Sequence, residues 1–307
     1  MTLDVSDNGL YKVPLMNRYH IQKQIGTGSY GTIYEGRDKL TNKRVAIKMS
    51  NDKTASRQHL EWEAHVYKTM KNTRVPLQEC MWPQVYDVGK SGDKLYMVMD
   101  YLGTCIDTIF KKNSCQFEPC TVAFIANRLI SLLRTFHNKG YLHRDLKPQN
   151  IVATSGKFPE IHLIDYGLVK PYLNTTKTQH CPLEYKNGLK GTLRYVSIAS
   201  HLGVGQSRRD DMQSLGYILV YLCKGSLPWQ HLNRLKTKAE DYQHVLRYKM
   251  ATPVEVLVRD IKPVELQKAL LSYLLTVNSL TFTQVPPYDY LLSLFDPSVK
   301  KFDGYLR

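Results

Sequence analysis

The stretch His143-Arg-Asp-Leu-Lys-Pro-Gln-Asn150 decides how the rest of this chain is interpreted. It brings a carboxylate, an ammonium group and a carboxamide close together, on Asp145, Lys147 and Asn150. Asp145 can accept a proton from a hydroxyl group, Lys147 can stabilise a phosphoryl group in transfer, and Asn150 can hold a metal ion through its side-chain oxygen. Pro148 fixes a bend, which favours a loop over the interior of a helix. The stretch is therefore a candidate catalytic loop.

Length and composition are those of a globular protein. The 307 residues can bury one large core or two modest lobes, and 43% of them are hydrophobic and 22% charged. The first residues contain acids and no long apolar run, so a signal peptide is not expected. The longest apolar run, Leu215 to Cys223, has nine residues, far fewer than the roughly 20 that cross a bilayer. We expect an intracellular protein of the cytoplasm, with the nucleus as a second compartment.

The net charge is +15, from 42 Lys and Arg against 27 Asp and Glu. Such a balance favours an anionic partner, whether an acidic or phosphorylated protein, a nucleic acid or a membrane surface. The basic residues are dispersed, with no block of five or more, which weakens the nucleic-acid alternative. The six cysteines form no CxxC pair and are expected to be reduced thiols.

A glycine-rich turn lies near the N-terminus. Residues 19–25 and 32–37 are predicted strands on either side of Gly26-Thr-Gly-Ser-Tyr-Gly31. Dinucleotide-binding proteins share the GxGxxG spacing, but their glycines open a helix. Here Thr-Ile-Tyr-Glu follows and is strand-like. A strand-turn-strand of this kind suits a flap over the phosphates of a nucleotide.

Lys48 ends a third predicted strand, which begins at Arg44. An isolated strand lysine is often only exposed, but one that follows the glycine turn can face bound phosphates. The next segment, residues 56–71, is predicted to be a helix. Three acids are candidate partners for Lys48, namely Glu61, Glu63 and, less favoured by position, Glu79.

Two further helices are expected around the catalytic loop. Residues 121–139 have apolar side chains at a period of 3.6, end at Gly140 and lead directly into the loop. Residues 211–224 are apolar nearly all round, which indicates a buried helix. Short strands at 151–152 and 161–164 follow the loop, and the second of them leads to Asp165.

These motifs together resemble those of protein kinases. Residues 143–150 fit the catalytic loop H-R-D-L-x-x-x-N, Asp165-Tyr-Gly167 resembles the D-F-G metal site with Tyr in place of Phe, and Val45-Ala-Ile-Lys48 resembles the strand that carries the phosphate-binding lysine. Within the kinases, residues 191–203, 206–216 and 225–230 are similar to the casein kinase 1 family, in which Ser-Ile-Asn replaces Ala-Pro-Glu; Ala199 stands here for the Asn. The resemblance covers residues 19 to about 296.

The resemblance implies an α+β, bilobal protein-kinase fold with a small β-rich N-lobe and a larger α-helical C-lobe. We expect a lead-in over residues 1–18, the N-lobe over 19–102, the C-lobe over 103–297 and a short end over 298–307. The resemblance also implies that Asp211 forms hydrogen bonds with the backbone of the catalytic loop.

The implied activity is a serine/threonine protein kinase that transfers the γ-phosphoryl group of ATP, with Mg²⁺, to protein hydroxyls. Asp145 would deprotonate the hydroxyl and Lys147 would offset charge on the phosphoryl group. The family's helix segment favours Glu63 as the partner of Lys48, and Asn150 with Asp165 would hold Mg²⁺. Met99 would be the gatekeeper, with the backbone of Asp100 and Leu102 bonded to the adenine. The implied ATP-binding residues are Ile25, Gly26, Thr27, Gly28, Ser29, Tyr30, Gly31, Ile33, Ala46, Lys48, Met99, Asp100, Leu102 and Val152.

The family's preference for acidic or pre-phosphorylated protein substrates implies an anion site, for which Arg194, Lys170 and Arg144 are the candidates. Guanidinium groups suit phosphate. Glu240 and Asp241 occupy positions where the family has lysines, so anion binding and a nuclear signal are weakened on that side.

A scaffold protein and a nucleic-acid-binding protein are the two alternative functions. A scaffold with the fold but without the reaction would lack one of the Lys, Asp or Asn residues of the motifs, and all are present. A nucleic-acid-binding protein would be expected to carry a recognisable binding motif, which this sequence lacks. Cys105 is better explained as a small hydrophobic residue than as a redox site.

We expect a monomer that acts on proteins and is active without phosphorylation of its activation segment.

Overall fold

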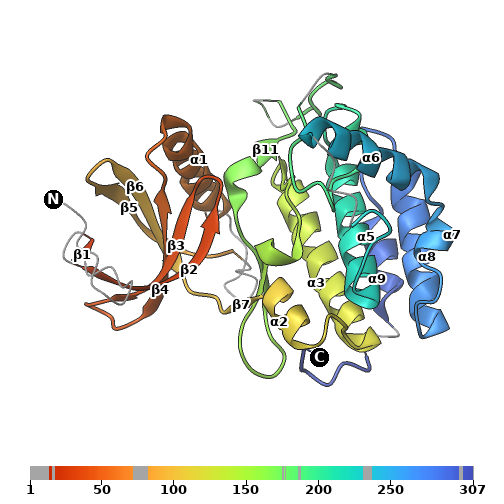
Figure 1. Ribbon diagram of the computed structural model, residues 1–307, viewed down its shortest axis with the longest axis horizontal. Coiled ribbons are helices and arrows are strands. Elements are labelled where there is room, and N and C mark those ends of the chain that lie inside the picture. The colour runs from red at the N-terminus through yellow and green to blue at the C-terminus, as the bar shows by residue number, and fades with distance from the viewer. Residues whose placement is uncertain are drawn as a thin grey trace. The chain divides into compact units, whose positions relative to one another are not determined.

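The computed structural model describes residues 14–15, 18–71, 82–174, 176, 178–185, 188–230, 237–296 and 300–306 (Figure 1). Two compact units divide the chain: residues 1–103 with 164–167 form the first, and residues 104–163 with 168–307 form the second. The domain limits predicted at residues 18, 102 and 297 stay predictions. Glu79 lies outside the described residues.

The first unit is built on an antiparallel sheet with the strand order β1-β2-β3-β4-β6-β5. Its strands are β1 (Pro14–Leu15), β2 (Tyr19–Gly28), β3 (Gly31–Asp38), β4 (Arg44–Ser50), β5 (Val85–Ser91) and β6 (Lys94–Asp100). Strand β4 shows how side chains alternate between the faces: Val45, Ile47 and Met49 are buried with the core cluster of the sheet, whereas Lys48 points to the other face. The alternation therefore directs Lys48 away from that core.

Glycine is required where β3 meets β4. A Cβ on Gly31 would lie 2.2 Å from the carbonyl oxygen of Met49, so no larger residue fits there without a backbone shift. The hairpin of β2 and β3 pairs Gly28 with Gly31 and leaves residues 29 and 30 as its turn. Both strands extend further toward the turn than the sequence predicts, because their ladder continues through the glycines.

Helix α1 (Thr54–Lys71) belongs to the first unit. Leu60, Glu63, Ala64 and Tyr67 are all buried and lie at helical spacing, so they share one face. Glu63 is thus a carboxylate within a mostly apolar stripe, whereas Glu61 is exposed. A buried carboxylate needs a partner, and the sheet supplies it.

The second unit is mainly helical. Its helices are α2 (Ile106–Lys112), α3 (Pro119–Asn138), α4 (Ile198–His201), α5 (Arg208–Lys224), α6 (Lys238–Ala251), α7 (Val254–Leu257), α8 (Val264–Asn278) and α9 (Tyr288–Ser293). Its short strands are β7 (Thr104–Cys105), β8 (Tyr141–Leu142), β9 (Ile151–Ala153), β10 (Ile161–Leu163) and β11 (Lys170–Pro171). Helices α3, α5 and α8 pack together in its core (Figure 1).

Helix α5 starts earlier than its apolar pattern predicts. Ser207 and Asp210 form a capping box, and Arg208 and Arg209 complete a polar first turn before the buried stretch. Gly225 ends the helix with a φ of 75°, a left-handed conformation that suits glycine. The nearly all-apolar run identified the buried part of the helix but not its capped start.

The sheet of the first unit and the helices of the second confirm the α+β class, with a β-rich N-lobe and a helical C-lobe. Among the described residues, the helices are too short or too polar for any of them to cross a membrane.

Candidate active site

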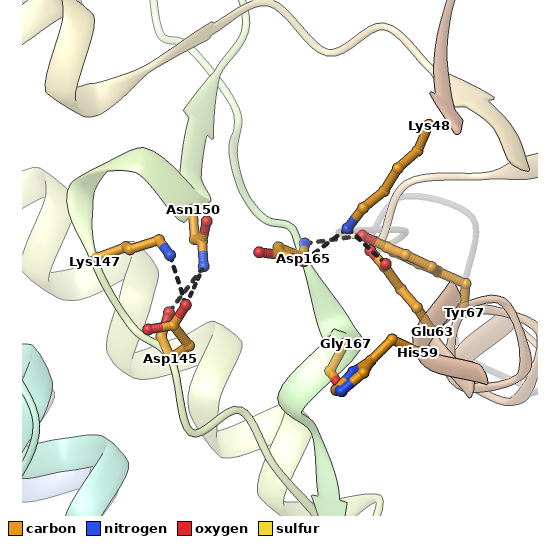
Figure 2. Close-up of polar contacts among 9 residues, drawn as sticks. All are labelled: Lys48, His59, Glu63, Tyr67, Asp145, Lys147, Asn150, Asp165 and Gly167. Atoms are coloured by element: carbon orange, nitrogen blue, oxygen red, sulfur yellow. Dashed lines mark hydrogen bonds and ion pairs between the residues drawn. The ribbon is translucent and has the colours of Figure 1, made fainter. Parts of the chain in front are cut away.

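Lys48 on β4 faces two carboxylates of the first unit (Figure 2). Its Nζ lies 2.7 Å from Oε2 of Glu63 and 2.8 Å from Oδ1 of Asp165. Burial favours the neutral amine, but the two carboxylates outweigh it and raise the pKa of Lys48 above its ordinary value. One ammonium group against two carboxylates leaves a net negative charge, so the cluster suits an additional cation.

Helix α1 also holds the segment that carries Asp165. The backbone N–H of Asp165 donates to the hydroxyl of Tyr67, and Nδ1 of His59 lies 3.1 Å from the carbonyl oxygen of Gly167. The ring of Tyr166 stacks on Tyr67 at 4.2 Å between centroids. Asp165 has a φ of 66°, a conformation that non-glycine residues rarely adopt and that is frequent at functional sites.

His59 and Tyr67 were not predicted from the sequence. They lie four residues before and four residues after Glu63, which places all three on one face of α1 (Figure 2). Once Glu63 is taken as the partner of Lys48, this four-residue spacing predicts that His59 and Tyr67 lie on the same face of the helix.

The catalytic-loop residues form a second cluster, within the second unit (Figure 2). Oδ2 of Asp145 accepts a hydrogen bond from Nζ of Lys147 at 2.6 Å. Its Oδ1 accepts one from the hydroxyl of Thr192 at 2.7 Å. Asn150 donates through Nδ2 to the carbonyl oxygen of Asp145 at 2.9 Å, so its side-chain oxygen takes no part in that bond. Both carboxylate oxygens of Asp145 are thus held in fixed directions.

Thr192 was also missed from the sequence. It lies 47 residues after Asp145, and no local pattern links the two.

Asp211 holds the start of the catalytic loop. It accepts hydrogen bonds from the backbone N–H groups of His143 and Arg144, each at 2.8 Å, and from Nε2 of His137 at 3.0 Å. Nδ1 of His137 is then left to accept from the hydroxyl of Tyr288. Burial would raise the pKa of Asp211, but the bond from His137 and the neighbouring donors outweigh it, so the net direction is downward.

The expected ATP-binding residues fall in both units. Gly26 pairs with Ile33 and Thr27 with Thr32 in the β2–β3 hairpin, and Ala46 pairs with Met99 between β4 and β6. Ile25 is exposed, Gly28, Ser29 and Gly31 complete the turn region, Leu102 follows β6, and Val152 is buried in β9 of the second unit. The roles assigned to these residues stay predictions.

Two of these residues, Tyr30 and Asp100, already form contacts that restrict how they could bind a nucleotide. The ring of Tyr30 stacks on His59 at 3.7 Å between centroids. The backbone N–H of Asp100 donates to the carbonyl oxygen of Gln84. A contact between Asp100 and an adenine would therefore have to use its carbonyl oxygen.

The three anion-site candidates differ in their surroundings. Lys170 is exposed and lies 3.3 Å from Glu184. The guanidinium of Arg194 lies over the rings of Tyr195 and Tyr221. Arg144 is largely enclosed, its Nε has no hydrogen-bond partner among the described residues, and burial lowers its pKa. Arg144 is thus the candidate whose charge is least compensated.

The described residues contain no group of three or more His, Cys, Asp or Glu that could hold a metal ion. The five cysteines of the described part of the chain are free thiols. The side-chain oxygens of Asp165 and Asn150 are of the kind that Mg²⁺ prefers.

The chain matches a model of a protein family. The model described as protein kinase domain matches residues 19–281, which include both clusters.

Proposed function

Since the chain belongs to the protein kinase domain family, whose members transfer the γ-phosphoryl group of ATP to proteins, we propose that it is a serine/threonine kinase of the casein kinase 1 type. Its proposed cofactor is Mg²⁺, and its proposed substrates are acidic or pre-phosphorylated proteins.

The geometry around Asp145 is the observation that carries this proposal. Lys147 and Thr192 bind different oxygens of the carboxylate, so its orientation is fixed from both sides. A carboxylate held in this way can orient a substrate hydroxyl and accept its proton. Lys147, two residues away, offers a positive charge for the phosphoryl group in transfer, and this lysine is typical of serine/threonine kinases.

Lys48 and its two carboxylates supply the second half of the proposed chemistry. Glu63 keeps the ammonium group of Lys48 in place, and the net negative charge of the cluster leaves Asp165 suited to a cation. Asp165 and Asn150 would hold Mg²⁺, which when bound neutralises charge on the phosphates. The chain's own contribution is then mostly positioning and charge compensation.

The substrate preference rests on Arg144 and on the net charge of +15. A partly enclosed guanidinium without a bonded carboxylate is costly, and an incoming phosphate or carboxylate would reduce that cost. Lys170 and Arg194 would contribute less in the arrangement described here, because each already has a partner.

Phosphate transfer from Mg·ATP to matched peptides tests the proposal. One peptide carries phosphoserine three residues before the target Ser, a second carries plain Ser there, and a third has Tyr as the target. We expect transfer to both Ser peptides, faster to the primed one, and none to the Tyr peptide. The Asp145→Asn variant should reduce kcat by about 10²–10⁴-fold and leave KM for ATP nearly unchanged.

Each part of the proposal can fail separately. Equal rates on the two Ser peptides would refute the substrate preference and retain the kinase. Transfer to the Tyr peptide would refute the serine/threonine assignment. Absence of transfer to every peptide and to casein would refute the activity and favour a scaffold function.

A further inference from the structure

Lys249 lies near the end of α6 and is 3% exposed, which is unusual for a lysine. Its Nζ donates hydrogen bonds to the carbonyl oxygens of Leu193 at 3.0 Å and Val196 at 2.5 Å. The ammonium group also lies 5.1 Å from the ring centroid of Tyr217 and 5.4 Å from that of Trp229. Lys249 takes part in no ion pair with a carboxylate of the described residues, and burial lowers its pKa well below the ordinary value.

A buried ammonium group without a carboxylate partner is a poor choice for stability alone. Apolar residues of similar volume are often at least as stable in such positions. Val245, one turn earlier on α6, is almost completely buried and apolar, so the helix can pack without a charge on this face. What an apolar residue would lose is the pair of hydrogen bonds to residues 193 and 196.

The segment that accepts these bonds, residues 192–196, is held at several points. Nε1 of Trp229 donates to the carbonyl oxygen of Arg194 at 2.8 Å, between the two carbonyls that Lys249 binds. The N–H groups of Tyr195 and Val196 both donate to the carbonyl oxygen of Thr192. Lys249 and Trp229 together fix a tight turn whose first residue is Thr192.

Thr192 connects this turn to the site. Its hydroxyl donates to Oδ1 of Asp145 at 2.7 Å, so the position of the turn sets the direction of that bond. The same turn carries Arg194, one of the anion-site candidates. A contiguous set of contacts therefore runs from Lys249, through residues 192–196, to the carboxylate proposed to accept the substrate proton.

We propose that Lys249 is a positioning residue for phosphoryl transfer, which acts by fixing residues 192–196 so that Thr192 orients Asp145. The inference rests on the proposed function of Asp145. In this role Lys249 acts through the turn, by its bonds to residues 193 and 196, and not through the substrate or the nucleotide.

Lys249→Met tests the proposal, because methionine retains much of the volume and removes the donor. Arg247→Met is the matched control, since it removes a positive charge from an exposed position of the same helix. We expect Lys249→Met to lower kcat by about 10- to 100-fold, with KM for ATP changed less than twofold, and the control to behave as wild type.

A double-mutant cycle with Thr192→Val separates positioning from general destabilisation. If Lys249 acts through Thr192, Lys249→Met should lower kcat little further in the Thr192→Val background. Two independent losses that multiply would refute the proposal, as would an unchanged kcat for Lys249→Met. If Lys249→Met does not fold, Lys249→Gln takes its place in the same cycle, because its uncharged donor lies one bond closer to the backbone and holds the two carbonyl oxygens less firmly.

Hydrogen exchange gives a readout that does not depend on activity. The amides of Tyr195 and Val196 should exchange at least tenfold faster in Lys249→Met than in wild type or Arg247→Met, because the turn opens more readily. If the amides exchange faster in Lys249→Met but the wild-type protein is inactive, the proposed function is refuted, and Lys249 still holds the turn of residues 192–196. Unchanged exchange in an active protein would refute the role of Lys249.

Discussion

Asp211→Asn should be among the most destabilising single-atom changes in the second unit. Asp211 is 2% exposed and accepts three hydrogen bonds, of which two come from the backbone of the catalytic loop. Oδ2 accepts from His143 and His137, and Oδ1 accepts from Arg144. Asparagine supplies one oxygen only, so its best orientation satisfies the two donors at the Oδ2 position and turns its amide N–H₂ toward the N–H of Arg144.

The expected loss follows from these contacts. One hydrogen bond to a charged group is removed, which costs about 1.5–3 kcal/mol, and a buried donor is left facing another donor, which costs about 1–3 kcal/mol more. The two remaining bonds lose their charge assistance. The free energy of unfolding should fall by about 4 kcal/mol, and Tm by roughly 6 °C for a chain of this size.

Thermal and urea unfolding of Asp211→Asn measure this effect. Asp289→Asn is the control, because Asp289 pairs with Arg134 while its side chain is 83% exposed, and such a pair contributes little. A Tm shift for Asp211→Asn no larger than that of the control would refute the argument that the buried carboxylate holds the loop.

Three further predictions concern other parts of the chain. Glu63→Gln should lower kcat/KM by about tenfold or more, because a neutral amide holds the neighbouring ammonium group less firmly; steady-state kinetics measures this, and a wild-type value would contradict it. Hydrogen bonding from Arg18 lowers the pKa of Asp38 from 3.8 to about 2, so the stability it contributes is present above pH 4 and is lost as the pH falls toward 2. The Tm difference between wild type and Asp38→Asn should shrink over that range, and a constant difference would refute the assignment. Burial raises the pKa of the Cys223 thiol to about 12, although Cys223 borders a pocket of about 660 Å³. Iodoacetamide at pH 8 should therefore label the exposed Cys115 long before Cys223. Peptide mass spectrometry measures the two rates of labelling.

Most of the secondary structure near the site could be predicted from the sequence. The strand-like runs around and after the glycine turn predicted β2, β3 and β4, apolar periodicity predicted α3, and a nearly all-apolar run predicted α5, because each pattern depends on residues a few positions apart. Strand β5 was not predicted: its sequence, Val85-Tyr-Asp-Val-Gly-Lys-Ser91, alternates weakly, and pairing with β6 defines it as a strand. The polar, capped start of α5 was missed for the related reason that a first turn carries little apolar signal.

The sequence by itself determined which residues carry reactive groups. Asp145, Lys147 and Asn150 are brought together by their spacing in one loop, and Lys48 is directed away from the core by the two-residue period of its strand. These features are local, so a linear pattern is enough to specify them.

The family resemblance favoured Glu63 and Asp211, and both contacts are confirmed, but the residues alone left these partners open and only the tertiary structure shows why they meet. Of the acids on α1, Glu63 meets Lys48 because its face of the helix is buried, whereas Glu61 is exposed. Thr192 reaches Asp145 across 47 residues, and Asp211 reaches His143 across 68. Contacts at such separations depend on how helices and strands pack around a common core. That packing is a property of the whole chain, which no short stretch of sequence encodes.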